Sequence, residues 1–106
     1  MRAPAVPVTM GSPRFLNVKT QSFSVTEAWF PAGAVLEPHT HDRPVLALML
    51  RGGFRTRIHG RSLDCDAGVA WTEPLGERHA NYVGVKGAQV IVIEPDATRT
   101  ELLDPF

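Results

Sequence analysis

Short runs of strand-forming residues, interrupted by glycine, proline and aspartate, fill the sequence from Phe15 onward. Val45–Leu50 is apolar at every position, as a strand covered on both faces would be. Gly52-Gly53 is expected to end that strand, and Phe54–Ile58 then alternates with arginine at every second position. Further strands are expected at Phe23–Trp29, Ser62–Cys65, Val69–Thr72, Ala80–Val83 and Val90–Glu94. Short strands at such regular spacing predict an all-β sandwich or barrel.

The length of the chain limits the number of domains. Its 106 residues fit one domain and leave no room for two. Residues 1–14 are rich in proline and are expected to form an N-terminal arm, and residues 15–106 are expected to form a single barrel. The only helical period is at Thr98–Leu103, where the pattern would allow a short C-terminal helix.

Charge and cysteine content exclude several classes of protein. Lysine plus arginine number 11 and aspartate plus glutamate number 11, so the chain lacks the basic excess of a nucleic-acid-binding surface. The single cysteine, Cys65, excludes an internal disulfide bond and fits a reducing compartment. No apolar run resembles a signal peptide or reaches membrane-spanning length. We therefore expect a cytoplasmic protein that binds neither nucleic acid nor a membrane.

Two histidines one residue apart, His39 and His41, point to a metal site. On a strand their side chains would lie on the same face, roughly 7 Å apart along the chain. Imidazole nitrogens bind divalent metals at about 2.1 Å, and a third donor would complete one face of the ion. His79, which begins a later expected strand, is the candidate for that donor. The alternative is a hydrogen-bonded polar cluster without a metal. His59 lies in an expected turn and is left out of the site.

The spacing of these histidines resembles the two motifs of the cupin superfamily. The first motif, G-x5-H-x-H-x3-E-x6-G, is matched at Gly33, His39, His41 and Gly52. The second motif, G-x5-P-x-G-x2-H-x3-N, is matched at Gly68, Pro74, Gly76 and His79. This resemblance implies a double-stranded β-helix, or jelly-roll barrel. It also implies a divalent transition metal (iron, zinc, manganese, nickel or copper) bound in the lumen by His39, His41 and His79.

The sequence departs from both motifs at one position each. Val45 stands where the family has a glutamate ligand, and Val83 stands where it has asparagine. Asn81 lies two residues before Val83 and on the same strand face as His79. Because Val45 is four residues after His41, it should face the same lumen, and a Val45→Glu substitution would then supply the missing carboxylate.

A more specific likeness exists within the superfamily. The stretches HTHDRPVLALMLRGGF and RSLDCDAGVAWTEPLGERHAN look like the ligand-sensing barrel of AraC-type transcription regulators. Those barrels often lack the glutamate, sometimes hold no metal and normally continue into helix-turn-helix units, which are not found in this sequence. The resemblance implies a sensing barrel that captures a small molecule without binding DNA directly.

Six residues are candidates for the wall of the ligand pocket. Glu37 shares the strand face of His39 and would be a substitute ligand, although the adjacent proline also fits a solvated loop carboxylate. Arg43 would either meet an anionic substrate at the pocket mouth or be an ordinary surface arginine. The other four candidates, which are apolar or carry an amide, would either contact the ligand or only pack within the barrel. The six are Glu37, Arg43, Val45, Met49, Asn81 and Trp71.

Two functions follow from these residues. The first is a small metal-binding cupin that binds or acts on a small organic molecule in the lumen, with oxygenase or lyase chemistry. The second is a metal-free sensing barrel of the AraC type. Enzyme and binding protein both remain open, because no general base or other catalytic residue can be named.

The outer face of one expected strand predicts a partner. If Val45 faces the lumen, then Leu46, Leu48 and Leu50 point outward. Burying each leucine fully contributes roughly 1.5–3 kcal/mol, so the stripe favours a covering surface. A homodimer is expected, because twofold pairing is the commonest way to cover such a stripe.

Overall fold

A computed structural model describes residues 12–58, 60–74 and 76–96, and these residues form seven β-strands and no helix. The strands are β1 (Arg14–Lys19), β2 (Phe23–Phe30), β3 (Val35–His39), β4 (Val45–Ile58), β5 (Arg61–Asp66), β6 (Ala70–Glu73) and β7 (His79–Pro95). The all-β prediction is therefore confirmed for this part of the chain. Most of the predicted arm, the helix predicted at Thr98–Leu103 and His59 lie outside the described residues.

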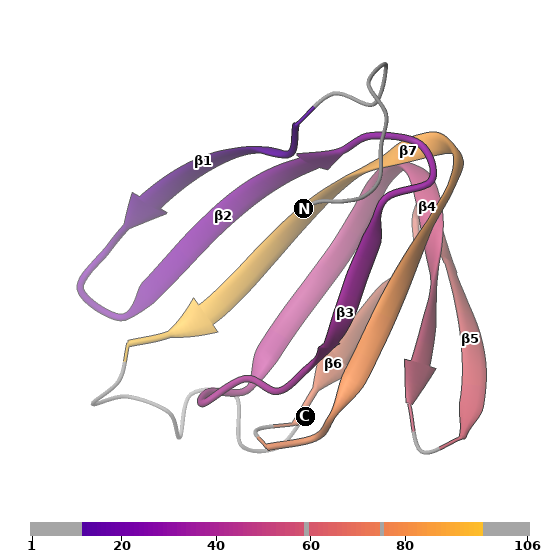
Figure 1. Ribbon diagram of the computed structural model, residues 1–106. Coiled ribbons are helices and arrows are strands. Elements are labelled where there is room, and N and C mark those ends of the chain that lie inside the picture. Colours follow the sequence, from indigo (N-terminus) through magenta and orange to yellow (C-terminus); the bar gives the residue numbers. More distant parts are fainter. Residues whose placement is uncertain (1–11, 59, 75, 97–106) are drawn as a thin grey trace.

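The strands form one strongly curved antiparallel sheet (Figure 1). Its order is β1-β2-β7-β4-β5, with β3 also paired to β7 and β6 also paired to β4. The long strands β4 and β7 pair with each other along most of their length. The sequence prediction divided each of them into two strands, and this was wrong. In β4 the hydrogen-bonded ladder continues past Gly52-Gly53 with a change of register instead of ending there.

Two glycines let β4 and β7 bend without separating. Gly52 has φ 66° and Gly87 has φ 73°, a conformation that residues with a Cβ atom rarely adopt. The strands approach so closely that a Cβ atom on Gly52 would lie 2.0 Å from the carbonyl oxygen of Gly87. A side chain on Gly52 would therefore collide with backbone. We call this bend, Gly52 and Gly87, the closed end of the barrel.

Because each long strand folds back at this bend, its first and last residues lie together on the opposite side of the molecule. We call that side the open end. Val45 at the start of β4 pairs with Glu73 of β6, whereas Ile58 at its end pairs with His79 of β7. The β3–β4 and β6–β7 connections lie at the same end (Figure 1). Residues far apart in the sequence thus meet at the open end.

Burial along β4 alternates as expected for a strand on which Val45 faces the lumen, so within this chain Val45–Leu50 is not covered on both faces. Val45, Ala47 and Met49 are buried, Leu46 is half-buried, and Leu48 and Leu50 are exposed. The prediction that the leucines point outward is confirmed. The buried face packs against residues of β2 and β7, among them Ala28, Val83 and Val90. Within the described residues, no helix is long and apolar enough to cross a membrane.

Candidate metal centre

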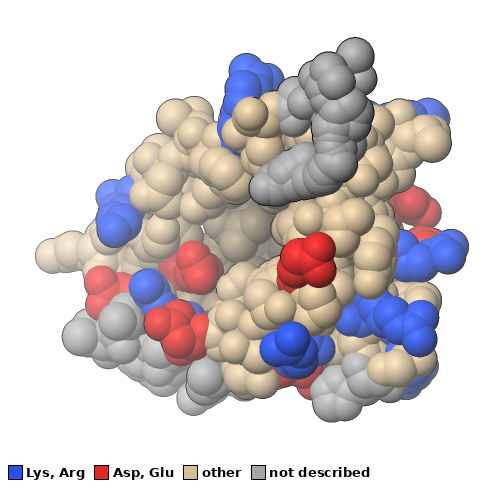
Figure 2. Space-filling view, viewed as in Figure 1, with Lys and Arg blue, Asp and Glu red and all other residues tan. Residues whose placement is uncertain are grey.

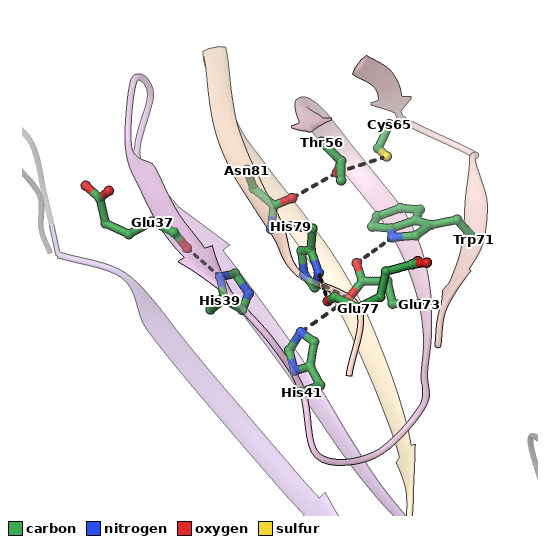
Figure 3. A network of polar contacts seen from close by, with 10 residues as sticks. All are labelled: Glu37, His39, His41, Thr56, Cys65, Trp71, Glu73, Glu77, His79 and Asn81. Atoms are coloured by element: carbon green, nitrogen blue, oxygen red, sulfur yellow. Dashed lines mark hydrogen bonds and ion pairs between the residues drawn. The ribbon is translucent and has the colours of Figure 1, made fainter. Parts of the chain in front are cut away.

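Three histidines converge at the open end of the barrel (Figure 3). His39 is the last residue of β3 and is the register partner of His79, the first residue of β7, while His41 lies in the connection from β3 to β4. One nitrogen from each ring lies within 4.8 Å of the other two. The ring centroids are 4.4 Å apart for His39 and His79, and 5.0 Å apart for His41 and His79. The structure thus brings together the three histidines that the sequence singled out.

Backbone carbonyls orient two of the three rings in the same way. Nδ1 of His39 donates to the carbonyl of Glu37 at 2.6 Å, and Nδ1 of His79 donates to the carbonyl of Glu77 at 3.2 Å. A carbonyl only accepts, so Nδ1 carries a proton in both rings, and in the neutral imidazole Nε2 then has the lone pair. Metal-binding histidines are commonly fixed in this manner. The Nε2 atoms are therefore the ones available to an ion.

Glu73 is the residue that the sequence analysis missed. It is the last residue of β6, it is 7% exposed, and its Oε1 atom lies 3.2 Å from Nε2 of His41 and 3.2 Å from Nε2 of His79. Its other oxygen, Oε2, accepts a hydrogen bond of 2.8 Å from Nε1 of Trp71 (Figure 3). The sequence did hold one signal, since Glu73 is two residues from Trp71 and so shares its strand face. The strand predicted at Val69–Thr72 stopped one residue too early.

The carboxylate and the imidazoles change one another's pKa. Burial raises the pKa of Glu73, but hydrogen bonds from His41 and Trp71 and the nearby imidazoles outweigh burial, and the result is a lowered pKa. The hydrogen bond to Glu73 raises the pKa of His41, against the effect of burial. Burial lowers the pKa of His39. Glu73 is therefore a carboxylate at neutral pH, and it favours the protonated form of His41 when no metal is present.

His79 carries the observation that tests whether a metal fits. Its Nε2 atom is buried and makes no hydrogen bond within the described residues, because its 3.2 Å contact with Glu73 is not directed as a hydrogen bond. An unpaired buried polar atom costs about 1–3 kcal/mol, and an ion at the centre of the cluster would satisfy it. Three imidazoles beside a carboxylate are donors that suit zinc, iron, copper, nickel or manganese. The residues present fit a divalent transition metal.

A cavity of about 240 Å³ adjoins the histidines. This volume is below the roughly 300–1,000 Å³ of sites for drug-sized molecules. Figure 2 shows a hollow in the middle of the face of the molecule that is seen in Figure 1, with mostly uncharged residues around it. The wall is largely apolar, with Phe30, Phe54 and Val92 among its residues.

Three of the six predicted pocket residues line this cavity, namely Val45, Asn81 and Trp71. The other three do not, and the structure gives a reason for each. Glu37 is exposed and points its carboxylate away from the cluster, because only its backbone carbonyl faces His39 (Figure 3). Arg43 turns to the end of β7, where Nη1 donates to the carbonyl of Pro95 at 3.1 Å.

Met49 is the third predicted pocket residue that lies off the cavity wall. It is completely buried in the core, two residues further along β4 than Ala47, which does line the cavity. Asn81, which lines the cavity, accepts a hydrogen bond of 2.8 Å from Oγ1 of Thr56. Cys65 is buried behind that pair, and burial raises the pKa of its thiol, as expected of a core residue.

Comparison with known proteins identifies the fold. No family model matches the sequence, and no curated protein matches it. KdgF from Halomonas sp. is similar in structure, with 22% identity, a TM-score of 0.70, and a match covering 86% of this chain and 82% of that one. A cupin superfamily protein from Desulfitobacterium hafniense gives 13% identity and a TM-score of 0.73 over 85% of this chain and 83% of that one. The chain has the cupin fold.

The predicted cupin jelly-roll is thereby confirmed as a fold. The polyketide cyclase RemF from Streptomyces resistomycificus has the same fold, with 24% identity and a TM-score of 0.69 over 78% of this chain and 63% of the cyclase. At these identities the likeness concerns the fold alone, since one fold hosts many activities. The resemblance to AraC-type sensing barrels stays a prediction.

Proposed function

We propose that this cupin binds one divalent transition metal through Nε2 of His39, His41 and His79, and that it binds a small organic molecule beside the metal. One observation carries the proposal: three imidazoles converge within 4.8 Å of one another at the wall of a cavity of about 240 Å³. Backbone carbonyls hold Nδ1 of His39 and His79, as they commonly do in metal-binding histidines.

The cavity wall indicates the chemistry of the ligand. A divalent ion held there supplies Lewis acidity toward an oxygen atom of the ligand. The aromatic and aliphatic wall suits the apolar body of a small molecule. None of the described residues that line the cavity is lysine or arginine, and Glu94 adds a negative charge. A neutral or singly charged molecule with an apolar body and oxygen donors fits this wall, and it would suit oxygenase or lyase chemistry.

A metal-free sensing barrel is the second candidate. The contact between His41 and Glu73 favours it, because a protonated imidazole and a carboxylate neutralise each other without an ion. This function leaves Nε2 of His79 without a hydrogen bond, which the metal-binding function does not.

Elemental analysis separates the two functions. The protein is purified without a polyhistidine tag and without added metal, and the metal bound per chain is measured. We expect about one ion per chain, most of it lost in His41→Ala and retained in His59→Ala, the histidine that the motifs leave out. Equal metal content in the two variants would overturn the site, and a metal-free wild type that also fails to bind added zinc would favour the sensing barrel.

A further inference from the structure

We propose that Glu73 is a fourth metal ligand, which supplies from β6 the carboxylate that the cupin motif places at position 45. The inference rests on the proposed function and deepens it, since it assigns to the same site a residue that lies outside both motifs. It also assigns the two carboxylate oxygens of Glu73 different tasks: Oε1 faces the metal position, whereas Oε2 is held by Trp71.

Distances to the neighbouring donor atoms support the ligand role. Two donors that each bind one ion at about 2.1 Å lie about 3.0 Å apart at an octahedral centre and about 3.4 Å apart at a tetrahedral one. Oε1 of Glu73 is 3.2 Å from Nε2 of both His41 and His79. Moreover, the contact with His79 has the length of a hydrogen bond but not its direction. An ion shared by the two atoms would account for this combination.

The surroundings of Glu73 hold its carboxylate in place. Its side chain is 8% exposed, so water cannot easily solvate it, and a buried carboxylate needs a cationic partner. Nε1 of Trp71 donates to Oε2 at 2.8 Å and so fixes the orientation of the group. Metal-binding carboxylates typically have such a hydrogen bond on the oxygen that does not bind the ion.

The register of the sheet explains why a carboxylate ligand could be carried by either β4 or β6. Val45 and Glu73 are directly opposite each other in the pairing of β4 with β6. Side chains at paired positions point to the same face of a sheet, with Cβ atoms roughly 4.5–5.5 Å apart. A carboxylate can therefore enter the lumen from either position. With Glu73 already present, Val45→Glu alone would add a second buried carboxylate beside the first, and we expect it to destabilise the protein.

The test compares zinc affinities by competition with a chelator, and it uses a swap of the carboxylate between the paired positions. Glu73→Gln should weaken zinc binding about 10–100-fold. The double variant Val45→Glu, Glu73→Val should recover most of that loss. Glu27→Gln is the matched control, since Glu27 of β2 is outside the cavity lining and bonds to Gln89 instead, and we expect its affinity to stay within about threefold of wild type.

The spectrum of bound Co²⁺ provides a second measurement, which Glu73→Gln would not change if Glu73 only stabilised the fold. The visible spectrum of the Co²⁺-loaded protein depends on the ligand set, so Glu73→Gln should alter it and Glu27→Gln should not. Unchanged affinity and spectrum in Glu73→Gln, with zinc binding lost in His41→Ala, would overturn the role of Glu73 and leave the three-histidine site standing. Failure of the wild type to bind zinc or cobalt would instead overturn the proposed function. If Glu73→Gln does not fold, the swap variant decides the question.

Discussion

The two ends of this barrel place opposite demands on their residues. At the closed end, Gly52 and Gly87 bring two backbones so close that no side chain fits between them. At the open end, by contrast, side chains bring polar atoms together: one ring nitrogen from each of His39 and His79 lies within 4.8 Å of the other, and Oε1 of Glu73 is 3.2 Å from Nε2 of His79. The closed end requires residues without a Cβ atom, whereas the open end requires side chains with nitrogen and oxygen donors.

The difference shows how the site depends on a bend far from it. Folding β4 in half places Val45 and Ile58 at the same end of the molecule, where they pair with Glu73 and His79 respectively. A donor on β6 and a donor on β7 therefore meet only because the long strands turn back. Changes at the closed end should remove the whole fold, whereas changes at the open end should alter function first.

Gly52→Ala should produce the largest effect. The new Cβ atom would lie 2.0 Å from the carbonyl oxygen of Gly87, at a φ of 66° that alanine rarely adopts. We expect the free energy of unfolding to fall by about 4 kcal/mol or more, or the variant to be insoluble. Urea denaturation measures the loss. Gly84→Ala is the control, because its Cβ atom would be 3.4 Å from its nearest neighbour, and it should cost less than about 1 kcal/mol. A stable Gly52→Ala protein would show that the bend tolerates a side chain.

Leu48→Glu tests whether the outer surface between the two ends is covered. We propose that the chain is a homodimer through this face, where Leu48 is 38% exposed and pairs with half-buried Ile91. Leu16 and Val18 of β1 add further exposed apolar area to the molecule. In a dimer, one unpaired charge per chain would be buried, at a cost of about 3 kcal/mol, and the dimer should dissociate.

Light scattering at micromolar concentration reads out the mass directly. The wild type should show twice the 11.6 kDa of one chain, and Leu48→Glu should show a single chain or unfold. A wild type with the mass of one chain would end the dimer proposal. A Leu48→Glu variant that stays dimeric with unchanged melting would move the interface to another surface.

The pH dependence of the metal-free protein gives the smallest effect and examines the open end alone. The lowered pKa of Glu73 stabilises the folded state above its ordinary value of 4.5, and this contribution is lost as pH falls through the folded pKa. The raised pKa of His41 stabilises the folded state below its ordinary value of 6.5, and this contribution is lost as pH rises through the folded pKa. Both contributions are present together between pH 4.5 and 6.5.

Glu73→Gln should therefore destabilise the metal-free protein most in that interval, by about 1–2 kcal/mol, and less at pH 8 or pH 3. Denaturation of wild type and variant in a chelator, at each pH, measures the difference. His39 has a lowered pKa and acts in the opposite direction, but it is present in both proteins, so most of its effect cancels. A difference that does not vary with pH would mean that His41 and Glu73 are not paired.

The sequence by itself determined the all-β class, the inward face of Val45 and Ala47, and the choice of His39, His41 and His79, but it did not predict β1 or β3. The class and the inward face follow from side-chain alternation along a strand, which is a property of neighbouring residues, whereas the choice of histidines follows from the resemblance to the two cupin motifs. The sequence did not reveal that Gly52 bends β4 instead of ending it, because a glycine signals both outcomes equally well.

Only the tertiary structure decided which carboxylate meets the histidines. The strand face that Glu37 shares with His39 allowed a substitute ligand, and the adjacent proline allowed a solvated carboxylate; in the structure its carboxylate points away from the cluster. Glu73 lies 34 positions after His39 in the sequence, and its Oε1 atom is 3.2 Å from two imidazoles. The pairing of Val45 with Glu73 depends on the register between β4 and β6, and register is set by the packing of the whole sheet. No local pattern in the sequence encodes which residues two distant strands place opposite each other.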